Sequence, residues 1–185
     1  MAGRRTDTRE RIQRVALELF TERGYDRTTL NEVAERLEIT RPALYYHFRT
    51  KEDILTSVME GLLDSMDELV DWAARQPRTH EARVEILHRI SALLEDQWRP
   101  LFAFAQVNQG AMRDIPAGER MQQSMFKLLS VLSTPEAGAK QQFEARLAVF
   151  AVIIGSIPFL FGMDVPESER SAVAMEVATD LLSRP

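Results

Sequence analysis

The amino-acid sequence predicts an all-α protein, with an N-terminal three-helix helix-turn-helix domain followed by a larger helical domain. Apolar residues recur at the i, i+3, i+4 and i+7 positions of a helix face along most of the chain. No segment shows the sustained alternation of apolar and polar residues that marks a strand. Clusters of Gly, Pro, Ser and Thr divide the chain into segments of helix length. With 185 residues, 45% hydrophobic and 28% charged, the composition is that of a globular protein.

The first helix is expected from Thr8 to Arg23 and is followed by Gly24, a C-terminal stop. Its apolar face comprises Ile12, Val15, Ala16, Leu19 and Phe20. A second helix is expected over residues 30–37. Either Thr28 or Thr29 can cap its N-terminus, and Glu32 completes a capping-box pattern with Thr29.

A third helix is expected over residues 41–47, because Thr40 is a suitable N-cap and Pro42 falls in the first turn, where proline is tolerated. Two short helices separated by about three residues form a helix-turn-helix. Such a motif places the start of its second helix in the major groove of DNA. There Arg41 can donate two hydrogen bonds to a guanine, whereas Thr40 and Lys51 can contact phosphate.

Further helices are expected over residues 51–75, 80–98, 101–112, 118–132, 139–161 and 168–183. Residues 147–163 form an uncharged run, which is shorter than the about 20 apolar residues of a membrane span and contains Gly155 and Pro158. We expect a buried helix and no membrane segment. The rest of the chain or a second subunit could cover it. Four acids of the helix at 51–75 are expected to form a solvated face: Asp64, Asp67, Glu68 and Asp71.

The charge of the chain is unevenly distributed. Residues 1–51 contain eleven Arg and Lys against eight Asp and Glu, a net charge of +3, and the remainder carries −8. This asymmetry favours a polyanionic partner for the N-terminal segment alone. The absence of cysteine excludes disulfides and thiolate metal sites. No apolar run follows the first basic residues, so we expect no export signal and a cytoplasmic protein.

The residue patterns of common enzymes are missing from the sequence. Glu85 and His88 have the spacing of a di-iron ligand pair, but the chain has three histidines and no second Glu-x-x-His pair. No nucleophile elbow, phosphate-binding loop or dinucleotide fingerprint occurs. We therefore expect no catalytic residue, no metal and no cofactor. The alternative to a DNA-binding protein is a helical small-molecule-binding protein or an enzyme with no DNA-directed role.

A dense motif covers the helix-turn-helix and the residues after it. It comprises Thr28, Thr29, Leu30, Val33, Ala34, the run ITRPALYYHF at 39–48, Lys51, Glu52, Ile54 and Leu55. With the upstream Leu19-Phe20-x-x-x-Gly24-Tyr25, it resembles the DNA-binding segment of the tetracycline-repressor (TetR) family of bacterial transcriptional regulators, over about residues 8–56. Glu38 departs from the pattern, because the family often has glycine in this turn. A left-handed conformation there would cost Glu38 free energy that glycine avoids.

The resemblance implies specific DNA contacts. By position, Thr29, Thr40, Tyr45, His47 and Lys51 would contact chiefly the DNA backbone, and Arg41, Pro42, Ala43 and Tyr46 the bases. Tyr45 could instead be a core residue. We expect Phe48 to be one, because it has no polar tip.

The resemblance also implies a DNA-binding domain at 1–50 and a ligand-binding and dimerisation domain at 51–185. A homodimer would form through the helices near 139–161 and 168–183. Side chains suited to a pocket are Met66, Trp98, Phe102, Gln106, Met121, Met125 and Phe126, with Asn108 as a further polar group. The implied function is a ligand-responsive, sequence-specific regulator. It would be a repressor that a small apolar effector releases from a palindromic operator in double-stranded DNA.

Overall fold

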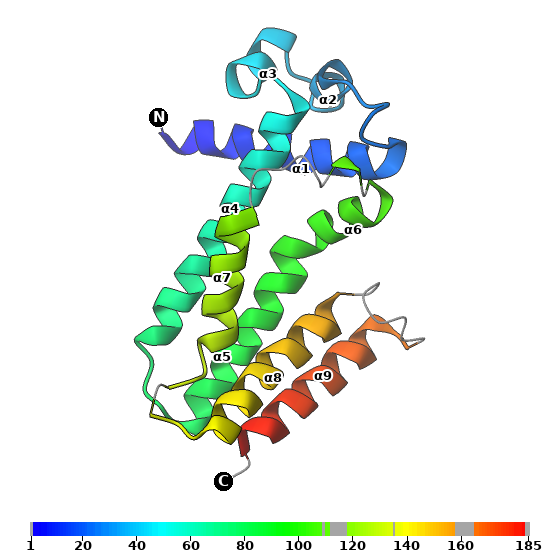
Figure 1. Cartoon of the computed structure of the whole chain (residues 1–185). Helices are drawn as coiled ribbons and strands as arrows, with labels where there is room; N and C mark the ends of the chain where they lie inside the picture. Colours follow the sequence, from blue (N-terminus) through cyan, green and yellow to red (C-terminus); the bar gives the residue numbers. More distant parts are fainter. Residues whose placement is uncertain (1, 109, 112–117, 135, 158–164, 184–185) are drawn as a thin grey trace. The chain divides into compact units, whose positions relative to one another are not determined.

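The computed structural model describes residues 2–108, 110–111, 118–134, 136–157 and 165–183, and every regular element in them is helical (Figure 1). The α-helices are α1 (Ala2–Arg23), α2 (Leu30–Arg36), α3 (Arg41–His47), α4 (Lys51–Ala74), α5 (His80–Leu93), α6 (Arg99–Val107), α7 (Gly118–Ser130), α8 (Ala139–Ser156) and α9 (Glu167–Ser183). A π-helix, η1 (Leu94–Trp98), joins α5 to α6. The prediction of an all-α fold is confirmed.

The helix boundaries test the sequence patterns more closely. The predicted bounds of α2, α3, α4, α7 and α9 agree with the structure to within two residues. Helix α1 begins at Ala2 and not near Thr8, α6 ends at Val107, and α8 ends at Ser156. Of the longer predicted ranges, residues 109, 112 and 158–161 lie outside the described part of the chain.

Packing divides the chain into two compact units. Unit 1 comprises Met1–Leu62 and Pro100–Gly118, and unit 2 comprises Leu63–Arg99 and Glu119–Pro185. These units differ from the predicted domains 1–50 and 51–185, because α6 and the first half of α4 pack with the N-terminal helices. The functional division at residue 50 remains a prediction.

In unit 1 the first three helices enclose an apolar core. Its largest side chains are at most 2% exposed and include Ile12, Leu19, Phe20, Leu44 and Phe48. Helix α1 ends at Arg23, and Gly24 follows it as the predicted C-terminal stop. The φ of Gly24 is 90°, in the region that favours glycine. Thr28 does not cap α2; its buried hydroxyl donates to the carbonyl of Gly24 at 2.9 Å and so fastens the turn before α2.

The π-helix η1 directly precedes α6, whose second residue is Pro100. Proline has no backbone N–H, and in an α-helix its ring clashes with the carbonyl four residues earlier. A turn of π-helix, with its wider hydrogen-bonding ring, lies at this position in the structure. The predicted break at Arg99-Pro100 is therefore a change of helix type within a continuous helical path.

In unit 2, α4 and α7 are linked by ion pairs. Asp67 accepts hydrogen bonds from Lys127 and Ser124, both at 3.2 Å, and Arg120 pairs with Asp64 and Asp67. The prediction of a solvated acidic face is confirmed for Asp64, Glu68 and Asp71, which are exposed, whereas Asp67 is half-buried. Burial raises the pKa of Asp67, but hydrogen bonds from Lys127, Arg120 and Ser124 outweigh it, so that the pKa lies below its ordinary value.

Helices α8 and α9 pack side by side in unit 2 (Figure 1). A Cβ atom added to Gly155 would overlap with the Cβ of Ala174, so the two helices approach too closely for a larger residue at position 155. The buried Arg170 donates its Nε–H to the Gly155 carbonyl at 2.8 Å. This hydrogen bond satisfies a carbonyl in the last turn of α8, where a cation is favoured.

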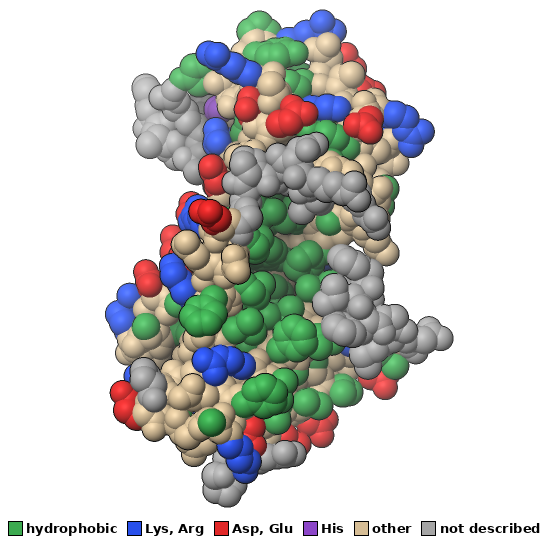
Figure 2. Space-filling view, in the orientation of Figure 1, with side chains coloured by type: hydrophobic (Ala, Val, Ile, Leu, Met, Phe, Trp, Pro, Cys, Tyr) green, Lys and Arg blue, Asp and Glu red, His purple; other side chains and the backbone are tan. Residues whose placement is uncertain are grey.

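An apolar face of α8 and α9 is exposed. On α8 it comprises Phe143 (63% exposed), Leu147 and Phe150 (42%), and on α9 Val173 and Val177 (46% each). Figure 2 shows hydrophobic side chains gathered on the surface where α7, α8 and α9 lie. The chain therefore leaves part of its uncharged run uncovered. Among the described residues, no helix combines the length and the hydrophobicity that crossing a membrane requires.

Candidate nucleic-acid interface

Helix α2 begins with a complete capping box. The Thr29 hydroxyl oxygen accepts the Glu32 N–H at 3.3 Å, and the Glu32 carboxylate accepts the Thr29 N–H at 2.8 Å and the Thr29 hydroxyl at 2.9 Å. Hydrogen bonds from the Thr29 backbone and then from its side chain lower the pKa of Glu32. The Thr29 hydroxyl proton is thus used within the protein. A contact to a DNA phosphate would require it to turn away from Glu32.

The turn between α2 and α3 is a Schellman motif. The Glu38 N–H donates to the Glu35 carbonyl and the Ile39 N–H to the Ala34 carbonyl, both at 3.1 Å. Glu38 has a φ of 55°, the one positive φ of a non-glycine residue in the described chain. Glu38 thus adopts the left-handed conformation that glycine adopts more readily, and its Cβ makes this conformation costly.

Helix α3 is fixed from one side. The Thr40 hydroxyl oxygen accepts the Ala43 N–H at 3.4 Å and caps the helix, as the sequence predicts. Leu44 is fully buried and Phe48 is 2% exposed, which confirms the prediction of Phe48 as a core residue. The Arg9 guanidinium lies 4.5 Å from the centre of the Phe48 ring and donates to the Ser57 hydroxyl at 2.6 Å.

The other side of α3 is exposed. Five of the predicted DNA contacts lie on this exposed surface, namely Arg41, Pro42, Ala43, Tyr45 and Tyr46, and His47 is half-buried. Tyr45 is 46% and Tyr46 66% exposed, so Tyr45 is not a core residue. Arg41 makes no ion pair with the described residues, whereas Arg23 and Arg36 are both paired with glutamates. The surface of α3 therefore presents one uncompensated guanidinium beside two aromatic hydroxyls.

Lys51 is the first residue of α4, four residues after the end of α3, and its side chain contacts Tyr25. Its ammonium donates to the Tyr25 carbonyl at 2.6 Å and lies 4.4 Å from the centre of the Tyr25 ring. The Tyr25 hydroxyl donates to Glu52 at 2.8 Å. The pKa of Glu52 is lowered by a hydrogen bond from its own backbone N–H and then by the one from Tyr25. Lys51 thus has a fixed position and two further N–H groups that could reach phosphate.

A family model described as bacterial regulatory proteins, tetR family, matches residues 12–58, which extend from the second half of α1 to the first third of α4. This N-terminal segment is therefore a TetR-family domain. The regulator AcrR of Shigella flexneri is 36% identical over 72 residues, 38% of this chain and 34% of AcrR. The repressor BepR of Brucella suis is 39% identical over 69 residues, 37% of this chain and 33% of BepR.

These alignments cover about a third of the length of the curated TetR-family relatives. The fold extends further. The TetR-family regulator PfmR of Thermus thermophilus matches with a TM-score of 0.62 over 94% of this chain and 99% of that protein, at 20% identity. At this identity the likeness shows the fold alone.

Two residues that support the TetR-family domain were not recognised from the sequence. Arg9 was counted only as a basic charge, although its contact with Phe48 holds the end of α3. Asn108 was named only as a polar group for a pocket, although its side chain hydrogen-bonds to the backbone of Tyr25, Phe20 and Phe104. The polar side chain in an apolar helix was the only available signal, and it did not indicate a partner.

The side chains predicted for a ligand pocket do not share one environment. Met66 and Trp98 are buried, Phe102, Met121 and Met125 are half-buried, and Gln106 and Phe126 are exposed. Phe102 and Gln106 belong to unit 1 and the other five to unit 2. A cavity in unit 2 is lined by none of the seven. This set remains a prediction.

Proposed function

We propose that the protein is a sequence-specific DNA-binding transcriptional regulator that reads the major groove with α3. The observation that carries the proposal is the exposed surface of α3, where Arg41 has no ion-pair partner among the described residues while Leu44 and Phe48 are buried behind it. A guanidinium held in this way can donate two hydrogen bonds to a guanine edge. The net charge of +3 over residues 1–51 favours binding to a polyanion.

The proposed contacts follow the exposed surface. The base contacts are Arg41, Pro42, Ala43 and Tyr46, and the backbone contacts are Thr29, Thr40, Tyr45, His47 and Lys51. Thr40 is better suited to phosphate than Thr29. Its hydroxyl oxygen accepts the Ala43 N–H while its proton remains available, whereas the Thr29 proton is donated to Glu32.

We propose that the regulator is a homodimer formed through α8 and α9. The support is the exposed apolar face, where Phe143, Leu147 and Phe150 follow one another at helical spacing and Val173 and Val177 extend the face on α9. Apolar patches of this kind mark interfaces. A dimer would place two copies of α3 on successive turns of DNA, about 34–36 Å apart, and would match a palindromic operator.

The regulator is proposed to repress and to respond to a small effector with an apolar body. The similarity to BepR, a transcriptional repressor, supports repression as the sign of regulation. An effector releases DNA only if it binds the DNA-free form more tightly than the DNA-bound form. By linkage, operator DNA must then weaken effector binding by the same factor.

Selection of random duplex DNA by the purified protein tests the proposal. We expect enrichment of a palindromic sequence that binds about a thousandfold more tightly than a scrambled duplex of the same length at physiological salt. Equal binding of both duplexes would overturn the proposal. That result would favour the alternative of a helical small-molecule-binding protein, which the cavity in unit 2 supports.

A further inference from the structure

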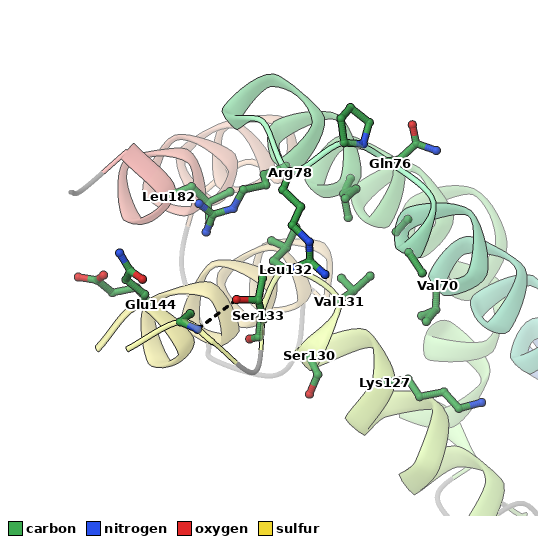
Figure 3. Close-up of a pocket in the computed structure, with 18 of the residues that line it drawn as sticks. Val70, Gln76, Arg78, Lys127, Ser130, Val131, Leu132, Ser133, Glu144 and Leu182 are labelled. Carbon is green, nitrogen blue, oxygen red and sulfur yellow. Dashed lines mark hydrogen bonds between the residues drawn. The ribbon is translucent and has the colours of Figure 1, made fainter. Parts of the chain in front are cut away.

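Unit 2 contains a cavity of about 480 Å³, a volume within the range of small-molecule sites. It forms where helix ends meet, at the ends of α4, α7 and α9 and the first halves of α5 and α8, together with the loops after α4 and α7 (Figure 3). Val70, Ile86, Leu132 and Leu182 contribute apolar wall. The cavity is therefore suited to a ligand with an apolar body.

Three buried polar atoms of the cavity residues have no hydrogen-bond partner in the described part of the chain. They are Arg83 Nε, Ser130 Oγ and Ser133 Oγ. Buried polar groups are normally hydrogen-bonded, because an unpaired one loses its interactions with water without replacement. All three residues line one cavity, so a polar group of a ligand bound there could supply the missing partners once the side chains turn toward it.

The cavity contains a positively charged group, the Arg83 guanidinium, that has no ion-pair partner among the described residues. The half-buried Arg83 makes no salt bridge with any described residue, and burial without a neighbouring carboxylate lowers its pKa. Lys127, by contrast, is paired with Asp67 at 3.2 Å. The cavity acid Glu144 is paired with Lys140 at 3.8 Å. An anion is thus the group that would complete the site.

We propose that this cavity binds a small organic carboxylate with an apolar body, its carboxylate held by the Arg83 guanidinium and by the hydroxyls of Ser130 and Ser133. A guanidinium matches a carboxylate with two parallel hydrogen bonds, and serine hydroxyls can donate to the remaining lone pairs. The apolar wall excludes water from the body of the ligand. The role of this ligand as the effector rests on the proposed function, but its binding to the cavity does not.

Calorimetric titration of the DNA-free protein tests the site with butanoate, octanoate and benzoate, each compared with its uncharged amide. We expect at least one acid to bind at least about tenfold more tightly than its amide. Arg83→Gln should remove this preference. Arg89→Gln is the matched control, because Arg89 lies on the same helix, pairs with Glu85 at 2.7 Å and does not line the cavity.

Three results would overturn the proposal: no binding of any acid, equal binding of acids and amides, or unchanged binding by Arg83→Gln. The melting temperature of ligand-free Arg83→Gln should equal or exceed that of the parent, because the replaced cation is unpaired. A large fall would show that Arg83 is structural and would also overturn it. An acid that binds as expected but leaves operator affinity unchanged would support the site and contradict only the effector role.

Discussion

The carboxamide of Asn108 accepts the backbone N–H of Tyr25, 83 residues earlier in the chain, at 2.8 Å. Its NH₂ group donates to the carbonyls of Phe20 at 3.1 Å and of Phe104 at 3.2 Å. One side chain in unit 1 therefore joins the end of α6 to the end of α1 and to Tyr25. Because Tyr25 also binds Lys51 and Glu52, the start of α4 depends on the same connection.

Asn108→Ala should lower the free energy of unfolding by about 1–3 kcal/mol, because it leaves the Tyr25 N–H and the Phe20 carbonyl without their partner. Urea denaturation measures the change. Gln106→Ala, at an exposed position two residues earlier, is the control and should stay within about 0.5 kcal/mol of the parent. Equal stabilities of the two variants would show that the Asn108 hydrogen bonds contribute nothing.

Glu38→Gly should stabilise the protein by about 1 kcal/mol, because the left-handed conformation at φ 55° costs a residue with a Cβ more than the unfolded-state entropy of glycine offsets. Glu38→Gln keeps the Cβ and should change stability by less than about 0.5 kcal/mol. Both variants remove a negative charge beside α3, so both should bind operator DNA more tightly. Thermal unfolding and DNA titration separate the two effects.

Arg41→Ala should cost about 1–3 kcal/mol of binding to the selected operator and should relax its sequence preference. Lys51→Ala should weaken binding to all sequences alike and reduce the slope of log affinity against log salt by about 1. Titrations of the selected and scrambled duplexes at several salt concentrations measure both. If Arg41→Ala weakens the two duplexes equally, Arg41 does not contact bases.

Asp67→Asn should lower stability at neutral pH by about 1 kcal/mol, because it weakens the ion pairs with Arg120 and Lys127, whose side chains are partly exposed. The pKa of Asp67 in the folded state lies below its ordinary value of 3.8. The stabilisation is therefore present above pH 3.8 and is lost as the pH falls through the folded-state pKa. Denaturation curves should show that the difference in unfolding free energy between the parent and Asp67→Asn is smaller in acid than at pH 7. The control Asp71→Asn, at an exposed position, should match the stability of the parent at both pH values.

Gly155→Ala should destabilise the protein by about 1–3 kcal/mol, because the new methyl group would overlap with Ala174 in α9. Gly61→Ala is the matched substitution in the middle of α4, where a Cβ meets no atom within 4 Å. It should stabilise by about 0.5–1 kcal/mol through the helix propensity of alanine. Melting temperatures that shift in the same direction would contradict this account of Gly155.

The sequence predicted those parts of the fold that depend on neighbouring residues. Helices α2 and α3 were located by caps at Thr29 and Thr40, whose partners lie three residues away. Glu38 was noted as a departure from glycine in this turn, and its conformation is left-handed. The pairing of Asp67 with Lys127 was not predicted, because it joins residues 60 positions apart and nothing in either helix specifies the partner.

The cavity of unit 2 could not be predicted for a different reason. Periodic apolar residues show which face of a helix is buried, and Met66 is indeed buried. They do not show where packing leaves space. The cavity lies at helix ends, where Arg83 from α5 meets Ser130 and Ser133 from the end of α7 and the turn after it, 47 or more positions later in the chain.

Because Gly155 and Ala174 approach closely, a substitution at one of these positions restricts which residues the other can hold. A methyl group gained on α8 can be accepted only if one is removed from α9, so Gly155→Ala should be tolerated in combination with Ala174→Gly. The double variant keeps the total side-chain volume at the contact between α8 and α9, but it places a glycine within α9, which destabilises that helix. Among natural variants of this chain, the residues at 155 and 174 should therefore change together and keep their combined size.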